Sequence, residues 1–555
     1  MSNEIRYGNC YWRRRSSLLF THSNRDMRFS HAAPVTREAG HVLFDEIKRM
    51  EDVLERSEAA FSDILDGFRR SIRCSTARLG TMYNATNPFL RLPDEVIALV
   101  MMKTPTNRRS KRVEVVVSHV CRRLRHIALS TSALWTQVTA TDLTRSMPDM
   151  LEAYLTRSNG RLIDVDLGIC KSYHGSRRDV DRIMGKICSY APLWRSFKFS
   201  YHSYAALQMP SHGCLDHPLP FLESIHSVPN LQRLELNINL PPKRPFPGGR
   251  QPPVFQPLFQ QGVPNLSVLV LQTWKFHFFW LLPTLGSLTS LTIGSSRLLD
   301  EHLVMDHSQQ TPIPILQLLS LPTLHQFALV DGTESTSFPV RLDMTPPHTS
   351  TADAQYSRLH SLRIPVQVLP ELFSIPQQVF EETTHLFVDV SVTDESFYAT
   401  LMAAANTHTG DIFPKLGYLT LCCGETQTEF PVEESDILMR MTSSINHLII
   451  MGNGHEMFEG ILDHHMDDSP YWPNLVDVYL DLVNHFTEDV HDLFDWCISR
   501  RERHNGFVLQ VADGYIEQMT SYNDSQYAEE LVVKLGIMQE VDGPTLPEAD
   551  RVWLE

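Results

Sequence analysis

One short phrase recurs along most of the chain, and it constrains the fold more than any other feature. Its skeleton is Pro-x-Leu-x-x-Leu-x-Leu, seen most clearly at residues 228–236 and 263–271. Further copies lie at residues 285–293, 321–329, 356–364, 413–421, 443–449 and 472–480, and weaker ones at 161–167, 193–199 and 383–388. Self-similarity at intervals of about 20–50 residues indicates a repeat architecture.

The spacing within each copy has a direct physical meaning. The last two apolar residues are two positions apart, so both side chains point to the same face of a short strand. The proline presets the turn that leads into the strand. One such unit cannot bury its apolar face alone, whereas stacked copies form a continuous core. The pattern therefore predicts core positions on successive parallel strands at Leu236, Leu271, Ile293, Leu329 and Leu421, with the intervening Glu235 and Thr292 tolerant of change.

This set of copies resembles leucine-rich repeats, in the irregular form found in many F-box proteins. The resemblance implies an α/β fold, with an irregular solenoid of parallel strands, helices and loops over residues 141–555. The Asn or Cys that the family places after the strand is mostly absent here.

A second informative segment, residues 88–138, precedes the repeats. Pro93 stands where the first turn of a helix tolerates a missing N–H. Asp94 and Glu95 then place negative charge at the positive end of the helix dipole. A second helix is predicted over residues 115–129. Its apolar stripe comprises Val116, Val120, Leu124 and Ile127. The segment is too short to enclose a core, so it usually needs a partner chain.

The order Leu92-Pro93, then Val120-Cys121-Arg122-Arg123-Leu124, then Leu134-Trp135 resembles an F-box, here assigned to residues 85–140. The resemblance implies binding to a Skp-type adaptor and, through it, to a cullin-based ubiquitin ligase. The matching positions that contact the adaptor or support the module are Leu92, Pro93, Ile97, Val120, Leu124 and Trp135. The family often has Trp where this chain has Leu124, and the loop 104–112 is long and basic. An ordinary helical hairpin with a chance Leu-Pro start is the alternative.

Residues 41–84 are expected to form one long amphipathic, coiled-coil-like helix. Apolar residues recur there at alternating steps of four and three from Leu43 to Phe68, with Ser57 filling one place and a slip at Ser71 and Ile72. The seam is able to form a coiled-coil dimer or to fold back onto the rest of the chain, and we slightly favour the second. Residues 1–40 are interpreted as a disordered tail in preference to a transit peptide.

Charge is distributed unevenly. Residues 1–126 carry a net charge of +9, whereas the remainder carries −25, and residues 425–495 hold 16 acidic side chains against one Arg. Such a surface repels nucleic acid and disfavours anionic membranes. It suits a basic protein target, for which Asp477 and Asp481 are the candidate contacts, or it serves only solubility.

The chain contains no recognisable catalytic motif. It has no phosphate-binding Gly-x-x-x-x-Gly-Lys loop, no Gly-x-Ser-x-Gly elbow and no His-Glu-x-x-His. The densest polar cluster, residues 463–468, precedes Ser-Pro and is interpreted as a loop. The histidines scatter along the chain without an evident partner arrangement. We therefore expect no catalytic residue, no metal, no cofactor and no enzymatic activity.

Two functions remain compatible with these features. The first is a substrate-recognition subunit of an SCF-type E3 ubiquitin ligase, which binds the Skp-type adaptor and cullin core through the F-box and an unknown target protein through the repeats. The second is a non-ligase interaction scaffold with a diverged F-box. No run of 18 apolar residues and no Cys-x-x-Cys pair occurs, which favours a cytoplasmic or nuclear protein with no membrane or nucleic-acid partner.

Overall fold

A computed structural model gives the fold. It describes residues 37–104, 112–140, 147–170, 177–202, 221–239 without 223, 258–273 without 260, 285–294, 313–330, 342–343, 358–390, 400–403 without 402, 412–423, 432–452, 472–481, 489–512 without 504–505, and 538–541. The chain divides into two compact units, residues 1–99 and residues 100–555, which are described separately. Most of the predicted tail, residues 1–36, lies outside the described part.

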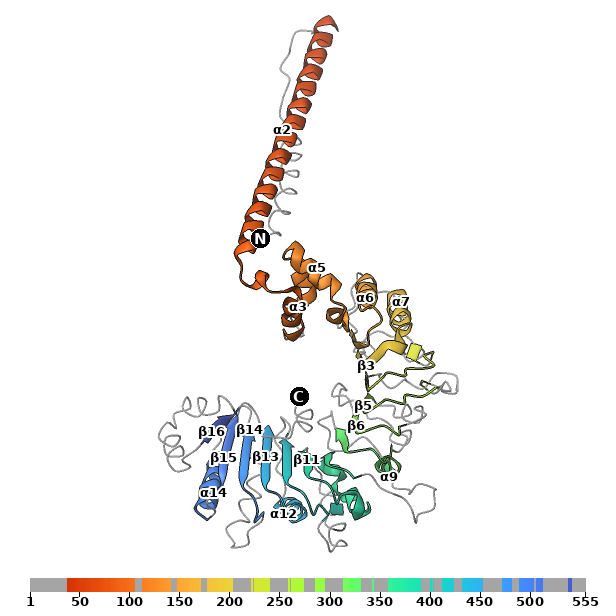
Figure 1. Ribbon diagram of the computed structural model, residues 1–555, viewed down its shortest axis with the longest axis vertical. Helices are drawn as coiled ribbons and strands as arrows, with labels where there is room; N and C mark the ends of the chain where they lie inside the picture. The colour runs from red at the N-terminus through yellow and green to blue at the C-terminus, as the bar shows by residue number, and fades with distance from the viewer. Residues whose placement is uncertain are drawn as a thin grey trace. The chain divides into compact units, whose positions relative to one another are not determined.

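The first unit is dominated by one helix. α2 runs for 50 residues, from Arg37 to Thr86, so the predicted long helix is confirmed and extends beyond both expected ends (Figure 1). A single 3-10 turn, η1 (Phe89–Arg91), follows it. The next helix, α3 (Asp94–Lys103), begins directly after Pro93, as the position of that proline predicts. The division between the units falls inside α3.

The second predicted helix of this region is wrong as a single element. The structure has two helices, α4 (Val113–Ser118) and α5 (Arg122–Ser130), followed by the 3-10 turn η2 (Ser132–Trp135). The chain breaks because Cys121 is extended, with φ −149° and ψ 167°, and serves as the N-cap of α5. Arg125 Nε then donates to the carbonyl of Ser118 over 2.6 Å, which satisfies one of the carbonyls at the end of α4.

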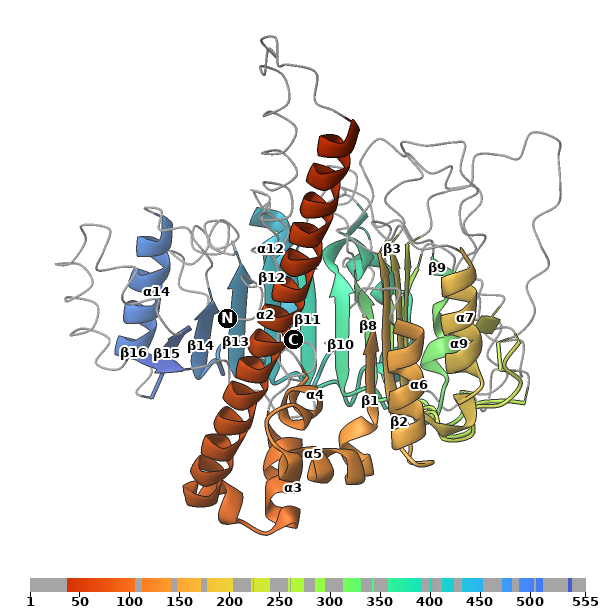
Figure 2. The same cartoon turned by 90° about the horizontal axis from the view of Figure 1, so that it is seen from above.

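One parallel sheet organises the second unit. Within the described residues it has 14 strands, all paired in parallel and in chain order, with β7 and β9 alone outside it (Figures 1 and 2). The strands are β1 (Gln137–Ala140), β2 (Ile163–Cys170), β3 (Trp194–His202), β4 (Arg233–Asn239), β5 (Val268–Thr273), β6 (Ser290–Gly294), β8 (Gln326–Val330), β10 (Ser361–Pro365), β11 (His385–Val390), β12 (Tyr418–Cys423), β13 (His447–Gly452), β14 (Asp477–Asp481), β15 (Val508–Ala512) and β16 (Met538–Val541). The expectation of an α/β fold with stacked parallel strands is confirmed.

Helices of unequal length occupy several of the connections between strands. They are α6 (Met147–Arg157), α7 (Arg177–Cys188), α9 (Ile315–Leu319), α10 (Leu369–Leu372), α12 (Val432–Met441) and α14 (Asp489–Arg503), with the 3-10 turns η3 (Ala191–Leu193), η7 (Val366–Val368) and η8 (Gln377–Val379). β7 (Ile313–Pro314) and β9 (Leu342–Asp343) form a separate two-stranded pair. Among the described residues, no helix is both long enough and apolar enough to cross a membrane.

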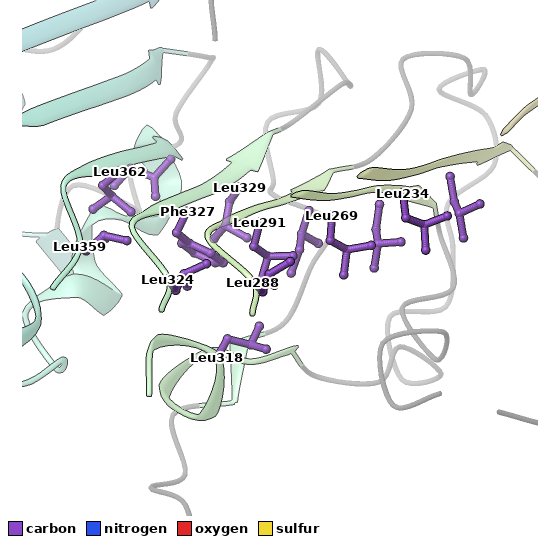
Figure 3. Packing of buried hydrophobic residues seen from close by; sticks show 14 of the residues in the cluster. Leu234, Leu269, Leu288, Leu291, Leu318, Leu324, Phe327, Leu329, Leu359 and Leu362 are labelled. Atoms are coloured by element: carbon purple, nitrogen blue, oxygen red, sulfur yellow. The ribbon is translucent and has the colours of Figure 1, made fainter. Parts of the chain in front are cut away.

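The leucines of the repeated phrase form the core. Leu234, Leu269, Leu291, Phe327 and Leu362 stand in register on β4, β5, β6, β8 and β10, and all are buried (Figure 3). The next inward row is Leu236, Leu271, Ile293 and Leu329, also in register and buried, as is Leu421 on β12. The predicted core positions are therefore confirmed.

In three copies of the phrase, the side chain before the first leucine bonds to a carbonyl about one repeat earlier. Asn230 Nδ2 donates to the carbonyl of Pro192 over 2.8 Å, and Asn265 Nδ2 donates to the carbonyl of Pro229 over 2.7 Å. Thr323 Oγ1 likewise donates to the carbonyl of Leu288 over 2.8 Å. Each bond joins one copy to the copy before it. These polar side chains therefore satisfy turn carbonyls that the strand ladder leaves open.

Candidate functional site

The six residues matched to adaptor-binding positions fall into two groups. Leu92, Pro93 and Val120 are exposed, Val120 to 61%, whereas Ile97, Leu124 and Trp135 are buried. Leu92, Pro93 and Ile97 belong to the first unit and the other three to the second. The first group is exposed to solvent, and the second group packs inside the segment.

α3 carries apolar side chains on its exposed sides as well as on its buried side. Ile97, Ala98 and Met101 are buried, while Val96 and Leu99 are exposed. Val100 and Met102 of the same helix are exposed as well. Single exposed apolar residues are ordinary, but four on one ten-residue helix are typical of a surface that another chain covers.

The segment around α4 repeats this feature in the second unit. Val115 and Val116 on α4 are exposed, and so is Val120 in the turn before α5. α5 in contrast buries Leu124, Ile127 and Ala128. The four residues predicted to share one stripe therefore separate. Val116 and Val120, before the break at Cys121, are exposed, whereas Leu124 and Ile127, after it, are buried. The turn presents Val120, not Leu124.

Trp135 joins this segment to the sheet. Its Nε1 donates to the carbonyl of Ala128 at the end of α5 over 2.7 Å. Its ring meets Tyr154 of α6 edge-on, with centroids 4.8 Å apart, and the Arg157 guanidinium lies 4.4 Å from the ring centroid. Trp135 is part of the main core of the second unit. Among the six matched residues, Trp135 therefore maintains the packing of the segment on the sheet.

A buried polar cluster lies beside Trp135. The Tyr154 hydroxyl donates to the buried Glu114 carboxylate of α4. The Arg112 guanidinium lies 4.5 Å from the Tyr154 ring centroid and donates to the carbonyl of Thr139 on β1. Burial, together with the hydrogen bond to Glu114, raises the pKa of Tyr154 well above its usual range. The tyrosine therefore stays a donor at physiological pH, and the cluster ties α4 to α6 and β1.

The outward face of the sheet is polar over β2 to β5. Arg195 forms two hydrogen bonds to Asp164, and Lys198 on β3 pairs with Glu235 on β4. Asn237 Nδ2 of β4 donates to Gln272 Oε1 of β5 over 2.8 Å. These side chains are half-buried or exposed and contact one another across strands, although Asn237 Oδ1 has no hydrogen-bond partner among the described residues. This part of the face therefore offers a charged, hydrogen-bonding surface of both signs.

On β11 to β14 the outward face carries stacked aromatic rings instead. The His385 ring stacks on Tyr418 with centroids 4.3 Å apart, and Tyr418 stacks on His447 at 4.2 Å. His447 Nδ1 lies 2.7 Å from Oδ2 of Asp477 on β14. The expectation that the histidines lack a partner arrangement is therefore wrong. The four residues are about 30 positions apart in sequence and meet only because their strands are in register.

The next outward row on these strands is closed to solvent. Phe387, Thr420, Ile449 and Tyr479 are all buried, and Tyr418 and Met451 pack against the last two. On β11 to β14 these intervening positions are therefore covered and are not open to a partner. Asp477 is half-buried and engaged by His447, and the side chain of the second candidate target contact, Asp481, lies outside the described part.

The described residues show little chemistry beyond these contacts. Burial raises the pKa of the Cys188 and Cys422 thiols to about 12, so both stay protonated and are poor nucleophiles. Those same parts of the chain hold no group of three or more potential metal ligands. The polar cluster at residues 463–468 lies outside them.

Comparison with known proteins adds no family. No protein-family model matches the chain, and no curated protein shows a significant similarity to it.

Proposed function

We propose that the chain is a substrate-recognition subunit of an SCF-type E3 ubiquitin ligase. Its F-box-like segment, residues 85–140, would bind a Skp-type adaptor, and its leucine-rich-repeat-like sheet would bind the target. The observation that carries the proposal is that α3, and separately α4 with the turn at Val120, carry exposed apolar side chains, all within the segment whose residue order resembles an F-box. A surface of this kind on short helices requires a partner.

The family often has Trp where this chain has Leu124, and the burial of Leu124 makes this difference less important for adaptor binding. Leu124 is only 6% exposed and lies on the buried side of α5. A residue in that position fills the interior of the segment, so leucine in place of the family's aromatic side chain removes no exposed contact. The neighbouring Val120 retains the exposed apolar group.

The proposed mechanism needs no chemistry from this chain. A target held by the sheet and an adaptor held by the helical segment become parts of one assembly. The target's lysines then meet the ubiquitin-loaded enzyme at a high effective concentration. The polar outward face on β2 to β5 and the stacked face on β11 to β14 are the regions that would select the target.

Charged substitutions in the helical segment test the adaptor surface. Val120→Asp, and separately Leu92→Asp with Pro93→Ala, should weaken binding of a Skp-type adaptor by about 30-fold or more, because each places a charge in a desolvated contact. The measurement is adaptor affinity by calorimetry, with recovery of the cullin from cells. Val476→Asp is the matched control, since Val476 is an equally apolar, exposed residue beyond the segment.

Two results would contradict the proposal in different ways. Full adaptor binding by both variants would remove this surface from the interface. Failure of the unaltered chain to recover adaptor and cullin would favour the alternative, a non-ligase scaffold that binds partners through its sheet.

Charge reversal tests the two candidate target contacts, Asp477 and Asp481. Asp477→Lys with Asp481→Lys should slow association with a target several-fold and leave adaptor affinity unchanged, because charges at an interface rim act mainly on encounter. The target would come from proximity labelling under proteasome inhibition, and rates would be measured across a salt series. Glu381→Lys with Glu502→Lys, both exposed, carries the same change in charge elsewhere. If the association rate with the target does not change with salt or with the substitutions at Asp477 and Asp481, the acidic residues serve only solubility.

A further inference from the structure

α2 carries a straight apolar stripe along nearly its whole length. An α-helix turns by about 100° per residue, and on that geometry ten exposed side chains fall within a band about 60° wide. They are Leu43, Ile47, Met50, Leu54, Phe61, Leu65, Phe68, Ile72, Leu79 and Tyr83. The stripe follows the 3.6-residue period of a straight helix instead of the 3.5-residue period of a long supercoil. It therefore runs past the slip expected at Ser71, which lies off the stripe.

The stripe is larger than a single chain normally leaves uncovered. Leu54, Phe61 and Phe68 are each more than 60% exposed, and most of the others are similar. Ten such side chains present on the order of 1,000 Å² of apolar surface, where a monomer's largest patch is about 300–600 Å². A standard protein interface buries about 800 Å² on each partner. The stripe is thus long enough to form a complete interface.

The order of residues along the stripe is nearly palindromic. Leu43 and Tyr83 are equally far from residue 63, and so are Ile47 and Leu79. The same holds for Leu54 with Ile72 and for Phe61 with Leu65. Two helices related by a twofold axis place equivalent residues at equal distances from the axis. An antiparallel pair centred on residue 63 would therefore bring apolar side chains opposite apolar side chains at these eight positions, while Met50 and Phe68 would lie opposite Thr76 and Glu58.

Charges beside the stripe have the complementary arrangement. Glu51, Glu55 and Glu58 flank it on one side in the first half of α2, and Arg69 and Arg73 flank it on that same side in the second half. In an antiparallel pair the same flanks of the two helices face each other. Reflection through residue 63 carries each of the three glutamates to within two positions of an arginine.

The whole helix shows the same polarity. Its acidic residues all precede residue 67, and residues 67–86 contain four arginines and no acid. On the opposite flank, reflection places Glu46 within two positions of Arg78. α2 also contains the exposed ion pairs Glu46–Arg49 and Asp66–Arg69, both at 3.1 Å, which are weak enough to exchange partners. A parallel pair would instead bring opposite flanks together at the same height, so Glu51, Glu55 and Glu58 would not face Arg69 and Arg73.

We infer that two copies of this chain associate through α2 as an antiparallel pair centred near residue 63. The apolar stripes cover each other, and Glu51, Glu55 and Glu58 of each copy face Arg69 and Arg73 of the other. This pairing makes the same contacts twice and closes on itself, as a twofold dimer requires. It is independent of the ligase proposal, because it uses no residue of the helical segment or the sheet.

The mass of the full chain in solution is the first measurement. Sedimentation equilibrium at micromolar concentration should give twice the 63.5 kDa chain mass. Leu54→Asp with Ile72→Asp should give the single-chain mass with unchanged melting of the sheet. Asp52→Lys with Arg70→Glu is the control, because both positions lie on the opposite side of α2, and it should stay dimeric.

A charge swap then fixes the orientation. Glu51→Lys, Glu55→Lys and Glu58→Lys in one chain, or Arg69→Glu and Arg73→Glu in another, should each weaken self-association at least tenfold. An equimolar mixture of the two variants should recover the dimer, and so should all five changes in one chain. The lysine variant mixed with the unaltered chain should stay weak, since its lysines would then face arginines.

Four outcomes would overturn the inference. They are a monomeric unaltered chain, an assembly larger than two, strong pairing of the lysine variant with the unaltered chain, and a monomer whose sheet melts earlier when the stripe carries aspartates. The third result would show that the glutamates do not face Arg69 and Arg73. The last result would show that α2 folds back onto its own chain.

Discussion

Replacing Trp135 with alanine is expected to destabilise the second unit by about 3–5 kcal/mol, because it removes a fully buried aromatic side chain from the main core. The change also leaves the carbonyl of Ala128 without the indole donor and removes the ring that Tyr154 and Arg157 contact. Urea unfolding followed by tryptophan fluorescence and circular dichroism measures the loss. Hydrogen exchange should show it first in β1, β2 and α6, since repeats lose stability locally.

Two variants separate the ring from its hydrogen bond. Trp135→Phe keeps much of the volume and should cost about 1–3 kcal/mol, the price of an unsatisfied buried carbonyl and a smaller ring. Leu129→Ala on α5, an exposed position, should cost less than about 0.5 kcal/mol. Unchanged unfolding in Trp135→Ala would mean that the segment before β1 does not pack on the sheet in solution.

The second large effect is expected at the centre of the sheet. Leu271→Ala on β5 should cost about 2–5 kcal/mol, because Leu271 lies between Leu236 and Ile293 in register and is 1% exposed. The cavity would open between two neighbouring repeats, so the loss includes the interface that joins them. The measurement is again the urea midpoint, with the slope checked for two-state behaviour.

The adjacent residue gives a matched control. Val270 is on the same strand but on the outward face and is half-buried. Val270→Ala should cost less than about 1 kcal/mol, since it removes fewer buried atoms. Equal losses at positions 270 and 271 would contradict the assignment of the inward and outward faces.

The strands with the full repeated phrase could be predicted from the sequence because two residues two positions apart can share a buried face only on a strand. Leu234, Leu269, Leu291 and Phe327 each occupy the same place in the phrase and the same row in the structure. The long helix α2 could also be predicted, since its apolar residues recur at the helical period over many turns. β1, β15 and β16 lack the phrase and could not be found this way. Their pairing with a neighbouring strand, not their own sequence, makes them strands.

The candidate sites were harder to predict, because they depend on what meets across repeats. The apolar periodicity predicts that Val120 and Leu124 lie on the same face. With the break at Cys121 between them, Val120 is exposed and Leu124 is buried. The stack of His385, Tyr418 and His447 was missed for the same reason, although aligning the copies by their leucines would have placed all three in one row.

The sequence by itself determined that residues of the repeated phrase are strands, which of their side chains face the core, and that residues 41–84 are helical. These properties follow from local periodicity and from the free energy of burying apolar side chains, both of which can be read one segment at a time. Only the tertiary structure decided where the F-box-like segment breaks, that Trp135 belongs to the sheet's core, and which outward positions are closed to solvent. Those outcomes depend on contacts between residues that are distant along the chain, and such contacts exist only after the strands have come into register.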